Sequence, residues 1–273
     1  MKPRWINTAI IAAGVLLCLS TLLLPVYDKW RTSRILATFE TETEDGQTEE
    51  KYRKMFEKAE EYNSLLLQTR KSGVRLKDEP LLSDESYNEL LNFGDGVMGS
   101  IEIPKISLTY PIYHTTDEEI LNTGIGHLQS TSLPTGTTGT HAVFSGHRGL
   151  PTAKLFTRLD ELAKGDLFFL NIGDRKFAYR INDIRVVEPS DTSVTEIDPD
   201  RDIVSLVTCT PYGINSHRLV VTGERVEITP EEEAAIKKSM PSITEMLIIA
   251  APFAMVFILL MSWINRNRCS VRY

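Results

Sequence analysis

The chain is organised around the stretch Ile203–Arg225, which reads IVSLVTCTPYGINSHRLVVTGER. Two apolar, β-branched runs, Ile203–Val207 and Leu219–Thr222, flank a loop rich in Pro, Gly and Asn, and this pattern predicts a β-hairpin. Residues that flank the loop of an antiparallel hairpin lie opposite each other. We therefore expect the thiol of Cys209 beside the guanidinium of Arg218 at one end of a sheet.

Two uncharged apolar runs lie near the ends of the 273-residue chain. Ile6–Val26 and Met246–Ile264 are each close to the length of about 20 residues that a bilayer-spanning helix needs. We predict an N-terminal anchor over 1–30, a C-terminal transmembrane helix over 244–265 and a tail over 266–273. A cleaved signal peptide is the alternative for the N-terminus.

The charges beside these runs predict the orientation. Lys2 and Arg4 precede the first run and a basic tail follows the second, and positive charge favours the cytoplasm. Basic residues at 29, 31 and 34 oppose this orientation, but the short basic tail outweighs them. We therefore expect both termini in the cytoplasm, residues 31–243 outside the cell, and contact with membrane lipid.

The chain has three cysteines. Cys18 lies in the first apolar run and Cys269 in the tail, so Cys209 has no disulfide partner in the outer part. It is predicted to be a free thiol, and a buried structural cysteine is the alternative. A net charge of −7 without a basic stripe in the outer part argues against nucleic-acid binding. Because neither a cysteine pair nor acidic residues at ligand spacing occur there, we predict no metal and no cofactor.

Helical periodicity is concentrated before residue 97. Apolar residues recur at helical spacing from Tyr52 to Leu66 and predict an amphipathic helix that ends before Gly73. A short helix is expected just before Gly94, so 31–96 forms a helical segment. Further on, we expect a helical turn within Ile120–Leu128 and a crossover helix over Ala153–Ala163.

The remainder is rich in short strands. Many short strands with few helices predict one mainly β domain, a closed or partly closed barrel over 97–229, followed by a linker over 230–243. Besides the hairpin, strands are expected at Val97–Ile103, Leu108–Tyr113, His141–Phe144, Leu167–Ile172 and Lys176–Val187.

A base for the predicted thiol has one strong candidate among the five histidines. His147 follows the run His141–Phe144 through Ser145 and Gly146, which places it at the end of a strand. A cysteine, a histidine and an arginine at strand ends of one sheet suit nucleophilic catalysis, with the arginine offsetting oxyanion charge.

The same residues lie in motifs that closely resemble the sortases and, within them, the pilin-polymerising class C enzymes. The resemblance covers about residues 92–227. Its motifs are LVTCTPYGINSHR at 206–218, FSGHRGLP at 144–151, GDGVMG at 94–99, IEIPKI at 101–106, and GHL at 126–128 before TSLP at 131–134.

This resemblance implies an eight-stranded sortase-type β-barrel and a role for each motif residue. Cys209 is expected to be the nucleophile and His147 the general acid and base. Arg218 is expected to bind the sorting signal and to stabilise the tetrahedral intermediate. Thr208 and His127, which lie in the matched motifs, are further candidates for substrate binding.

Class C enzymes also carry a lid before the barrel, with an Asp-Pro-aromatic motif. Here the segment 76–82 reads LKDEPLL, so Glu79 interrupts the Asp-Pro pair and no aromatic residue follows. Asp78 could still pair with Arg218, and Leu81 could cover Cys209. An ordinary flexible connector is the alternative.

The resemblance implies a membrane-anchored cysteine transpeptidase on the surface of a Gram-positive cell. Such an enzyme cleaves an LPxTG-like sorting signal through a thioacyl intermediate and joins pilin subunits through the acceptor lysine of another pilin. One alternative is a housekeeping-type sortase that attaches surface proteins to peptidoglycan. Another is a non-catalytic, membrane-tethered barrel that binds pilins.

Overall fold

The computed structural model describes residues 14, 23, 24, 26–37, 46–72, 83–150, 153–236, 246, 250, 251, 253–255, 257, 258 and 261. The chain divides into two compact units. One comprises Met1–Trp30 together with Met240–Tyr273, and the other comprises Arg31–Ser239. The second unit contains the whole β-rich region and is the subject of the description below.

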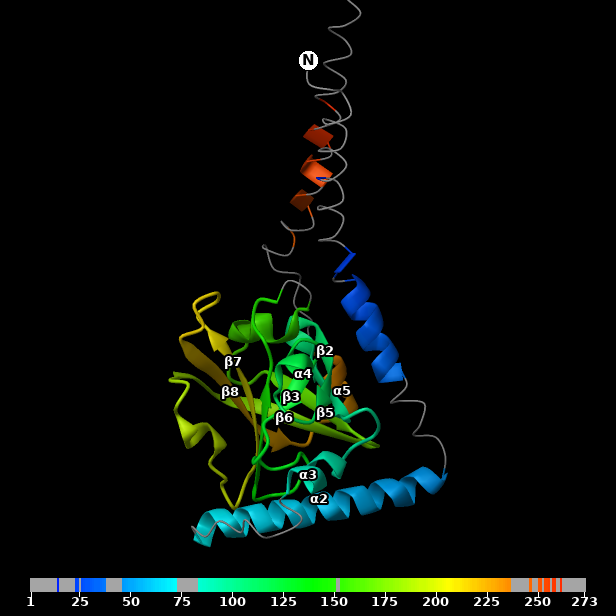
Figure 1. The fold of residues 1–273 in the computed structure, drawn as a ribbon, viewed down its shortest axis with the longest axis vertical. Coiled ribbons are helices and arrows are strands. Elements are labelled where there is room, and N and C mark those ends of the chain that lie inside the picture. Colours follow the sequence, from blue (N-terminus) through cyan, green and yellow to red (C-terminus); the bar gives the residue numbers. More distant parts are fainter. Residues whose placement is uncertain are drawn as a thin grey trace, which may run out of the picture. The chain divides into compact units, whose positions relative to one another are not determined.

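In the described part of this unit, eight strands close into a barrel (Figure 1). The mainly β, eight-stranded prediction is confirmed, and all strands fall within the range predicted for the barrel. Around the barrel the strands follow the order β1-β2-β3-β4-β7-β8-β6-β5. Their bounds are β1 Val97–Ile103, β2 Leu108–Tyr113, β3 Ile125–His127, β4 Thr140–Ser145, β5 Leu167–Ile172, β6 Arg175–Val187, β7 Asp202–Thr210 and β8 His217–Val226.

Strand alternation explains the core. Along β7, Val204 and Leu206 are fully buried in the hydrophobic core, and Phe144 of β4 joins them there. Because side chains on a strand point alternately to its two faces, the even-numbered positions of β4 and β7 face inward. Each such large apolar side chain contributes about 1.5–3 kcal/mol on burial. The core therefore fixes which face of each strand looks outward.

Two of the strand pairs are parallel, β2 with β3 and β4 with β7. The β4–β7 pair runs one-for-one from Thr140 opposite Asp202 to Ser145 opposite Val207. The carboxyl ends of these two strands therefore meet at the same end of the barrel.

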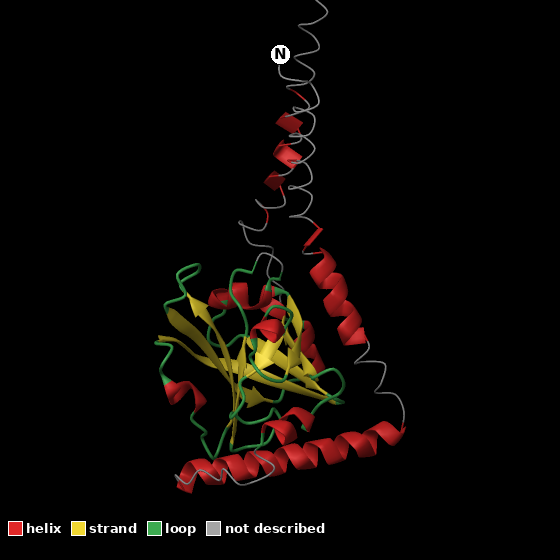
Figure 2. Cartoon of the chain, viewed as in Figure 1, coloured by secondary structure: helices red, strands yellow, loops and turns green. Residues whose placement is uncertain are grey.

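The long helix α2, Gly46–Ser72, runs along the outside of the barrel (Figure 2). Its predicted apolar stripe is buried, and Asn63 anchors it in the middle. Asn63 Oδ1 accepts from the Leu133 amide at 2.7 Å, and Asn63 Nδ2 donates to the Leu133 carbonyl at 2.9 Å. Near the end of the helix, Arg70 donates to the carbonyls of Ser130 and Thr195. The helix thus fastens the β3–β4 and β6–β7 connections.

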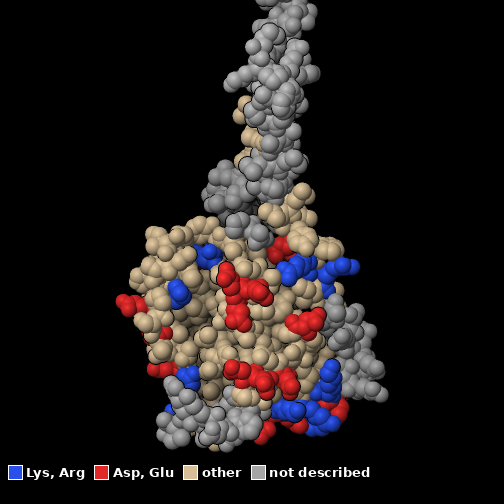
Figure 3. Space-filling model, viewed as in Figure 1, with Lys and Arg blue, Asp and Glu red and all other residues tan. Residues whose placement is uncertain are grey.

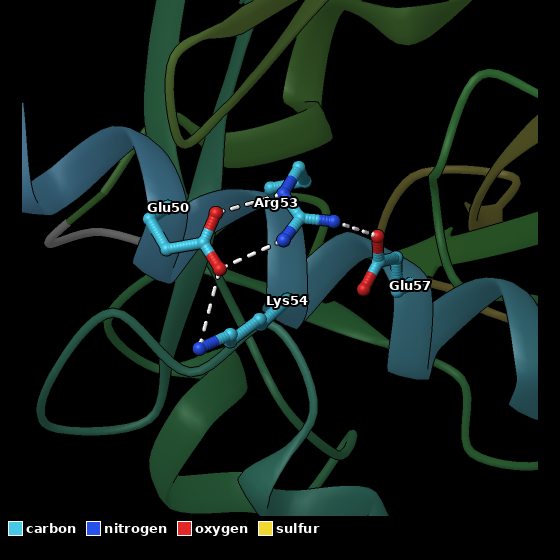
Figure 4. A network of polar contacts seen from close by, with 4 residues as sticks. All are labelled: Glu50, Arg53, Lys54 and Glu57. Carbon is cyan, nitrogen blue, oxygen red and sulfur yellow. Dashed lines mark hydrogen bonds and ion pairs between the residues drawn. The ribbon is translucent and has the colours of Figure 1, made fainter.

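The outer face of α2 carries an exposed ionic network (Figure 4). Arg53 bridges Glu50 and Glu57, and Lys54 also reaches Glu50, at 3.2 Å. Hydrogen bonds from Arg53 and Lys54 lower the pKa of Glu50 to about 2. Exposed pairs of this kind contribute little to stability, so the buried stripe holds the helix in place.

Two predicted helices differ from the structure. Ile120–Leu128 was expected to be a helical turn, but only α4, Glu118–Leu121, is helical and β3 follows it. Pairing with β2 and β4 overrides the local preference of this short segment. The predicted crossover helix is the 3₁₀ segment η3, Leu155–Glu161, kinked within its length. The Phe156 amide, in the first turn where amides have no partner within the helix, donates to the His147 carbonyl.

The remaining elements are short. The predicted helix before Gly94 is α3, which starts at the N-cap Ser83. The bounds are α3 Asp84–Glu89, η2 Pro104–Ile106, η4 Thr192–Thr195 and α5 Pro230–Ala234.

The first unit contains the two apolar runs predicted to cross a membrane, and most of their residues lie outside the described ones. Among the residues that are described, none of the helices has both the length and the apolar character required to span a bilayer.

Candidate active site

The β7–β8 hairpin places the predicted thiol and guanidinium together. Cys209 pairs with Arg218 across the hairpin, and the next pair is Thr210 with His217. The predicted juxtaposition of Cys209 and Arg218 is therefore confirmed at the level of the backbone register.

His147 reaches the same end of the barrel from the neighbouring strand. β4 ends at Ser145, opposite Val207 of β7, and His147 lies two residues beyond that end. The hydroxyl of Thr208 donates to the Gly146 carbonyl at 2.7 Å and holds the segment before His147 against β7. The parallel pair thus delivers the histidine beside the strand that carries Cys209.

The three side chains share an intermediate exposure. Cys209 is a free thiol, and His147 and Arg218 are also half-buried. Arg218 Nη1 donates to the carbonyls of Asn215, at 3.3 Å, and His217, at 3.1 Å. Among the described residues no carboxylate lies within ion-pair distance of Arg218. A guanidinium has five N–H donors, so this side chain is chemically suited to bind an anionic or carbonyl oxygen.

The loop between β7 and β8 adds apolar surface. Tyr212 and Ile214 are 60% and 72% exposed, and both follow Cys209 closely in sequence. Gly149 approaches the ring of Tyr212 so closely that a Cβ would lie 2.7 Å from it. Gly149 also has φ +84°, which disfavours any other residue. The His147 segment and the hairpin loop therefore pack against each other through this glycine.

This arrangement suits acyl transfer by a thiol. Cys209 supplies the nucleophile, and a histidine on the adjacent strand is the group able to take and return a proton. The guanidinium beside the thiol can stabilise negative charge on a tetrahedral intermediate. In the described part of the chain, no group of three or more His, Cys, Asp or Glu side chains is arranged to hold a metal ion.

Thr208 is buried, with 2% of its surface exposed, and its hydroxyl is bonded to Gly146. Its hydroxyl therefore holds the segment before His147 against β7 and does not face solvent.

His127 is fully buried in β3 and is part of the core packing. Its Nε2 lies 2.9 Å from the Ser132 carbonyl, which requires a proton on that nitrogen, so Nδ1 accepts from the Tyr87 hydroxyl at 2.8 Å. Burial lowers the pKa of His127 to about 3 and keeps the ring neutral. Both nitrogens are thus used within the fold, and the substrate-binding role predicted for His127 is not supported by its position.

The predicted lid residues Asp78 and Leu81 lie outside the described residues. Arg148 lies in the quoted motif at 144–151 but was not among the site residues predicted from the sequence. The signal available for it was its place next to His147, at a position whose side chain must point to the opposite face of the sheet.

Three comparisons agree on the family. The sortase domain model matches residues 101–226. The chain is 34% identical over 131 residues to sortase D of Bacillus subtilis, a match that covers 47% of this chain and 63% of that protein. It is 30% identical over 130 residues to sortase A of Bacillus anthracis, covering 48% of this chain and 60% of that protein. The chain thus spans less than two thirds of the length of these relatives.

Solved structures match over a longer part of the chain. Sortase C1 of Streptococcus agalactiae is 39% identical, with a TM-score of 0.64, and the match covers 72% of this chain and 100% of that one. Sortase C of Streptococcus pneumoniae is 36% identical, with a TM-score of 0.61 and coverage of 72% and 98%.

Fold, site and relatives together define the class: the chain belongs to the sortase family of transpeptidase enzymes. Within that family, its structural neighbours are class C sortases. They include sortase C of Clostridium perfringens, solved with a C-terminal cell wall sorting motif, which is 38% identical with a TM-score of 0.59 and covers 72% of this chain and 98% of that one.

Proposed function

We propose that this chain is a membrane-anchored cysteine transpeptidase that cleaves an LPxTG-like sorting signal and joins pilin subunits by a lysine isopeptide bond. The observation that carries the proposal is the register of one hairpin. It sets Cys209 opposite Arg218, while the parallel β4–β7 pair brings His147 to the same end of the barrel.

The first half-reaction forms a thioester. His147 takes the thiol proton, and the Cys209 sulfur attacks the threonine carbonyl of the signal. Arg218 donates hydrogen bonds to the oxyanion of the tetrahedral intermediate. The Thr–Gly bond then breaks, and His147 returns a proton to the departing glycine amine. The threonine is left bonded to sulfur as a thioacyl enzyme.

The second half-reaction resolves this thioester. A lysine amine of another pilin attacks the same carbonyl, His147 accepts a proton from that amine, and the thiol of Cys209 leaves. Because the thioester conserves the energy of the cleaved amide, no nucleotide is needed. Anchoring enzyme and substrates in one membrane raises their effective concentration and speeds both encounters.

Relatives support pilin subunits as substrates. The Streptococcus pneumoniae sortase C structure bears on pilin substrate specificity, and the Clostridium perfringens sortase C was solved with a sorting motif. The second candidate function is attachment of surface proteins to peptidoglycan. It is favoured by the match to sortase A of Bacillus anthracis.

A product assay separates these two functions. The protein is incubated with pilin subunits that carry the LPxTG-like signal, and with a peptidoglycan-derived amine in a parallel reaction. Covalent pilin ladders with a Thr–Lys isopeptide bond, identified by mass spectrometry, are the expected result. Single subunits joined only to the wall amine would favour the second function, and ladders formed by Cys209→Ala would overturn the mechanism.

The two-span topology, with the catalytic unit outside the cell, is part of the same proposal. Protease added to intact cells should digest Arg31–Ser239 and spare tags at both termini. A tag that is lost before the membrane is broken would refute this topology.

A further inference from the structure

The segment after β4 continues the register of β4 with β7 beyond the end of the strand. The register runs one-for-one along the whole of β4. Carried forward, it places His147 beside Cys209, and then Arg148 beside Thr210. A hydrogen bond marks this last pair, since Arg148 Nη1 donates to the Thr210 hydroxyl at 3.0 Å. This side-chain bond links the segment after β4 to the last residue of β7, beyond the last paired residues Ser145 and Val207.

A second hydrogen bond lies on the other side of the proposed catalytic pair. The Thr208 hydroxyl donates to the Gly146 carbonyl at 2.7 Å, one residue before His147 and Cys209. The two strands are thus tied together immediately before and immediately after the position where thiol and imidazole must meet.

The side chains that form the Arg148–Thr210 and Thr208–Gly146 hydrogen bonds are directed away from the proposed catalytic thiol. Leu206 points into the core, and Thr210 lies on the same face of β7 because side chains alternate along a strand. The 8% exposure of the Arg148 side chain agrees with this direction. Cys209 lies on the opposite face of β7. Because the side chain of Arg148 is buried and bonded to Thr210, we place it outside the proposed catalytic pair.

Arg148 is itself held by η3. Its Nη2 forms an ion pair with Asp160, whose side chain is half exposed. Two more hydrogen bonds join η3 to the segment that carries His147. The Gly149 amide donates to the Thr157 hydroxyl at 3.1 Å, and the Phe156 amide donates to the His147 carbonyl at 3.1 Å. Arg148 thus links β7 to η3 across the segment that carries His147.

The energetics argue against a purely stabilising role. Arg148 Nε is buried and, among the described residues, has no hydrogen-bond partner. An unsatisfied buried donor destabilises the fold, and an ion pair whose carboxylate is half exposed adds little stability. A residue placed at such a site for stability alone would serve better as an apolar side chain.

We propose that Arg148 is a positioning residue that keeps His147 in register with Cys209 through its bonds to Thr210 and Asp160. This role rests on the proposed function. In it, Arg148 sets the distance between the Cys209 thiol and the His147 imidazole. Without the Arg148–Thr210 bond, the hydrogen bonds of this segment to β7 end at Gly146, whose amide donates to the Val207 carbonyl and whose carbonyl accepts from Thr208. We then expect the distance between the imidazole and the sulfur to vary more.

The test uses the intact protein with two variants that cut the bond from opposite sides, Arg148→Met and Thr210→Val. Each is expected to lower kcat for signal-peptide cleavage about 10-fold with little change in KM, because positioning acts on the reacting geometry. The double variant should be no worse than the single ones, since both remove one interaction. Multiplying effects in the double variant would overturn the proposal.

Arg158→Met is the matched control. Arg158 lies on η3, its side chain is 10% exposed, and it pairs with Glu161, so the substitution removes a comparable buried arginine. We expect its kcat to match the wild type. An equal loss of kcat in Arg158→Met and Arg148→Met would show that Arg148 acts only through packing, and would contradict the positioning role. Should Arg148→Met fail to fold, Thr210→Val decides the outcome alone.

The rate of Cys209 alkylation by iodoacetamide, followed against pH, does not depend on any transpeptidase activity. Loss of the imidazole in His147→Ala should change this profile, and Arg148→Met and Thr210→Val should both shift toward the changed profile. Wild-type profiles in both variants would refute the positioning role. If wild type alkylates in a His147-dependent way but cleaves no signal, the proposed function fails while the positioning role stands.

Discussion

Strand β7 carries chemically different side chains at its two ends, a carboxyl group at Asp202 and a thiol at Cys209. At its start, Asp202 is buried and accepts hydrogen bonds from Thr140 and Tyr179, each at 3.2 Å. At its end, Cys209 is a half-buried free thiol. One strand thus carries a polar group satisfied by the fold and, at its other end, the proposed nucleophile, which is partly exposed. The difference teaches that burial with complete hydrogen bonding marks structural groups, and partial exposure with few bonds marks reactive ones.

Replacing His147 by Gln tests the reactive end most strongly. Removal of a general acid and base typically lowers kcat by about 10²–10⁴-fold, and the half-exposed ring should leave the melting temperature unchanged. Signal-peptide cleavage and a thermal melt measure the two effects. His217→Gln is the control, since this exposed histidine lies at the same end of the barrel. Equal losses in both variants would deny His147 a special role.

Replacing Arg218 by Lys should have the next largest effect. Lysine keeps the charge but lacks the planar fork of donors, so we expect kcat to fall about 100-fold. Unfolding by urea should be unchanged, because the described bonds of Arg218 go only to the carbonyls of Asn215 and His217 at the loop end of the hairpin. A variant with wild-type kcat would show that charge alone is sufficient.

At the structural end, Asp202→Asn should change stability and not chemistry. Burial raises the pKa of Asp202 to about 6 from its ordinary 3.8. The folded state holds this proton more tightly, so the stabilisation is complete below pH 3.8 and is lost as the pH rises through 6. At pH 7.5 the neutral amide should therefore raise the unfolding free energy by up to about 3 kcal/mol.

That advantage should vanish at pH 4, where Asp202 is itself protonated in the folded protein. Urea unfolding at both pH values measures it, with Asp200→Asn as the exposed control in the neighbouring connection. A change in stability of the same size at both pH values would contradict a titration effect.

The buried histidines should show the opposite pH dependence. Burial lowers the pKa of His127 to about 3, and it also lowers the pKa values of His114 and His141. The unfolded chain binds these protons near pH 6.5, so stability is present above pH 6.5 and is lost as the pH falls toward 3. Between pH 6.5 and 5, His127 alone should cost about 2 kcal/mol.

This loss precedes the titration of ordinary carboxylates and can be measured by urea unfolding in small pH steps. The loss of unfolding free energy with falling pH should be steeper in Asp202→Asn. This variant lacks the carboxyl group whose protonation near pH 6 stabilises the wild-type fold and offsets part of the loss. A flat stability between pH 6.5 and 5 in that variant would show that the buried rings are protonated in the folded state.

The smallest effect is expected on the outer face of α2. Glu50→Gln removes the centre of the exposed network in Figure 4, and we expect the melting temperature to stay the same because solvent screens such pairs. A clear loss of stability would mean that the network, and not the buried stripe with Asn63, holds the helix.

The hairpin and its register were predictable from sequence because the evidence is local. Alternation and the Pro-Gly-Asn loop suffice to set Cys209 opposite Arg218. His147 was identified as a candidate from its place at a strand end. That it meets β7 depends on a parallel pair between distant segments, which no local pattern encodes.

Other features were decided by tertiary contacts. His127 lies in a motif, and sequence alone could not show that Tyr87 and Ser132 would occupy both its nitrogens. The short strand β3 and the kinked η3 likewise follow from partners elsewhere in the chain.

Acidic and basic side chains are unevenly distributed over one face of the molecule. On the face in view in Figure 3, acidic side chains gather in the middle and basic ones lie mostly toward the edges.

The parallel pairing of β4 with β7 also has a consequence for how the newly made chain acquires activity. The thiol and the guanidinium come together when a local hairpin closes, whereas the Thr208–Gly146 contact spans 62 residues. Contacts between distant segments form slowly, because the entropy of closing a long loop opposes them. A partly folded chain therefore holds its nucleophile beside the arginine while it still lacks the base. Under the proposed mechanism, we expect transfer activity only after β4 has paired with β7.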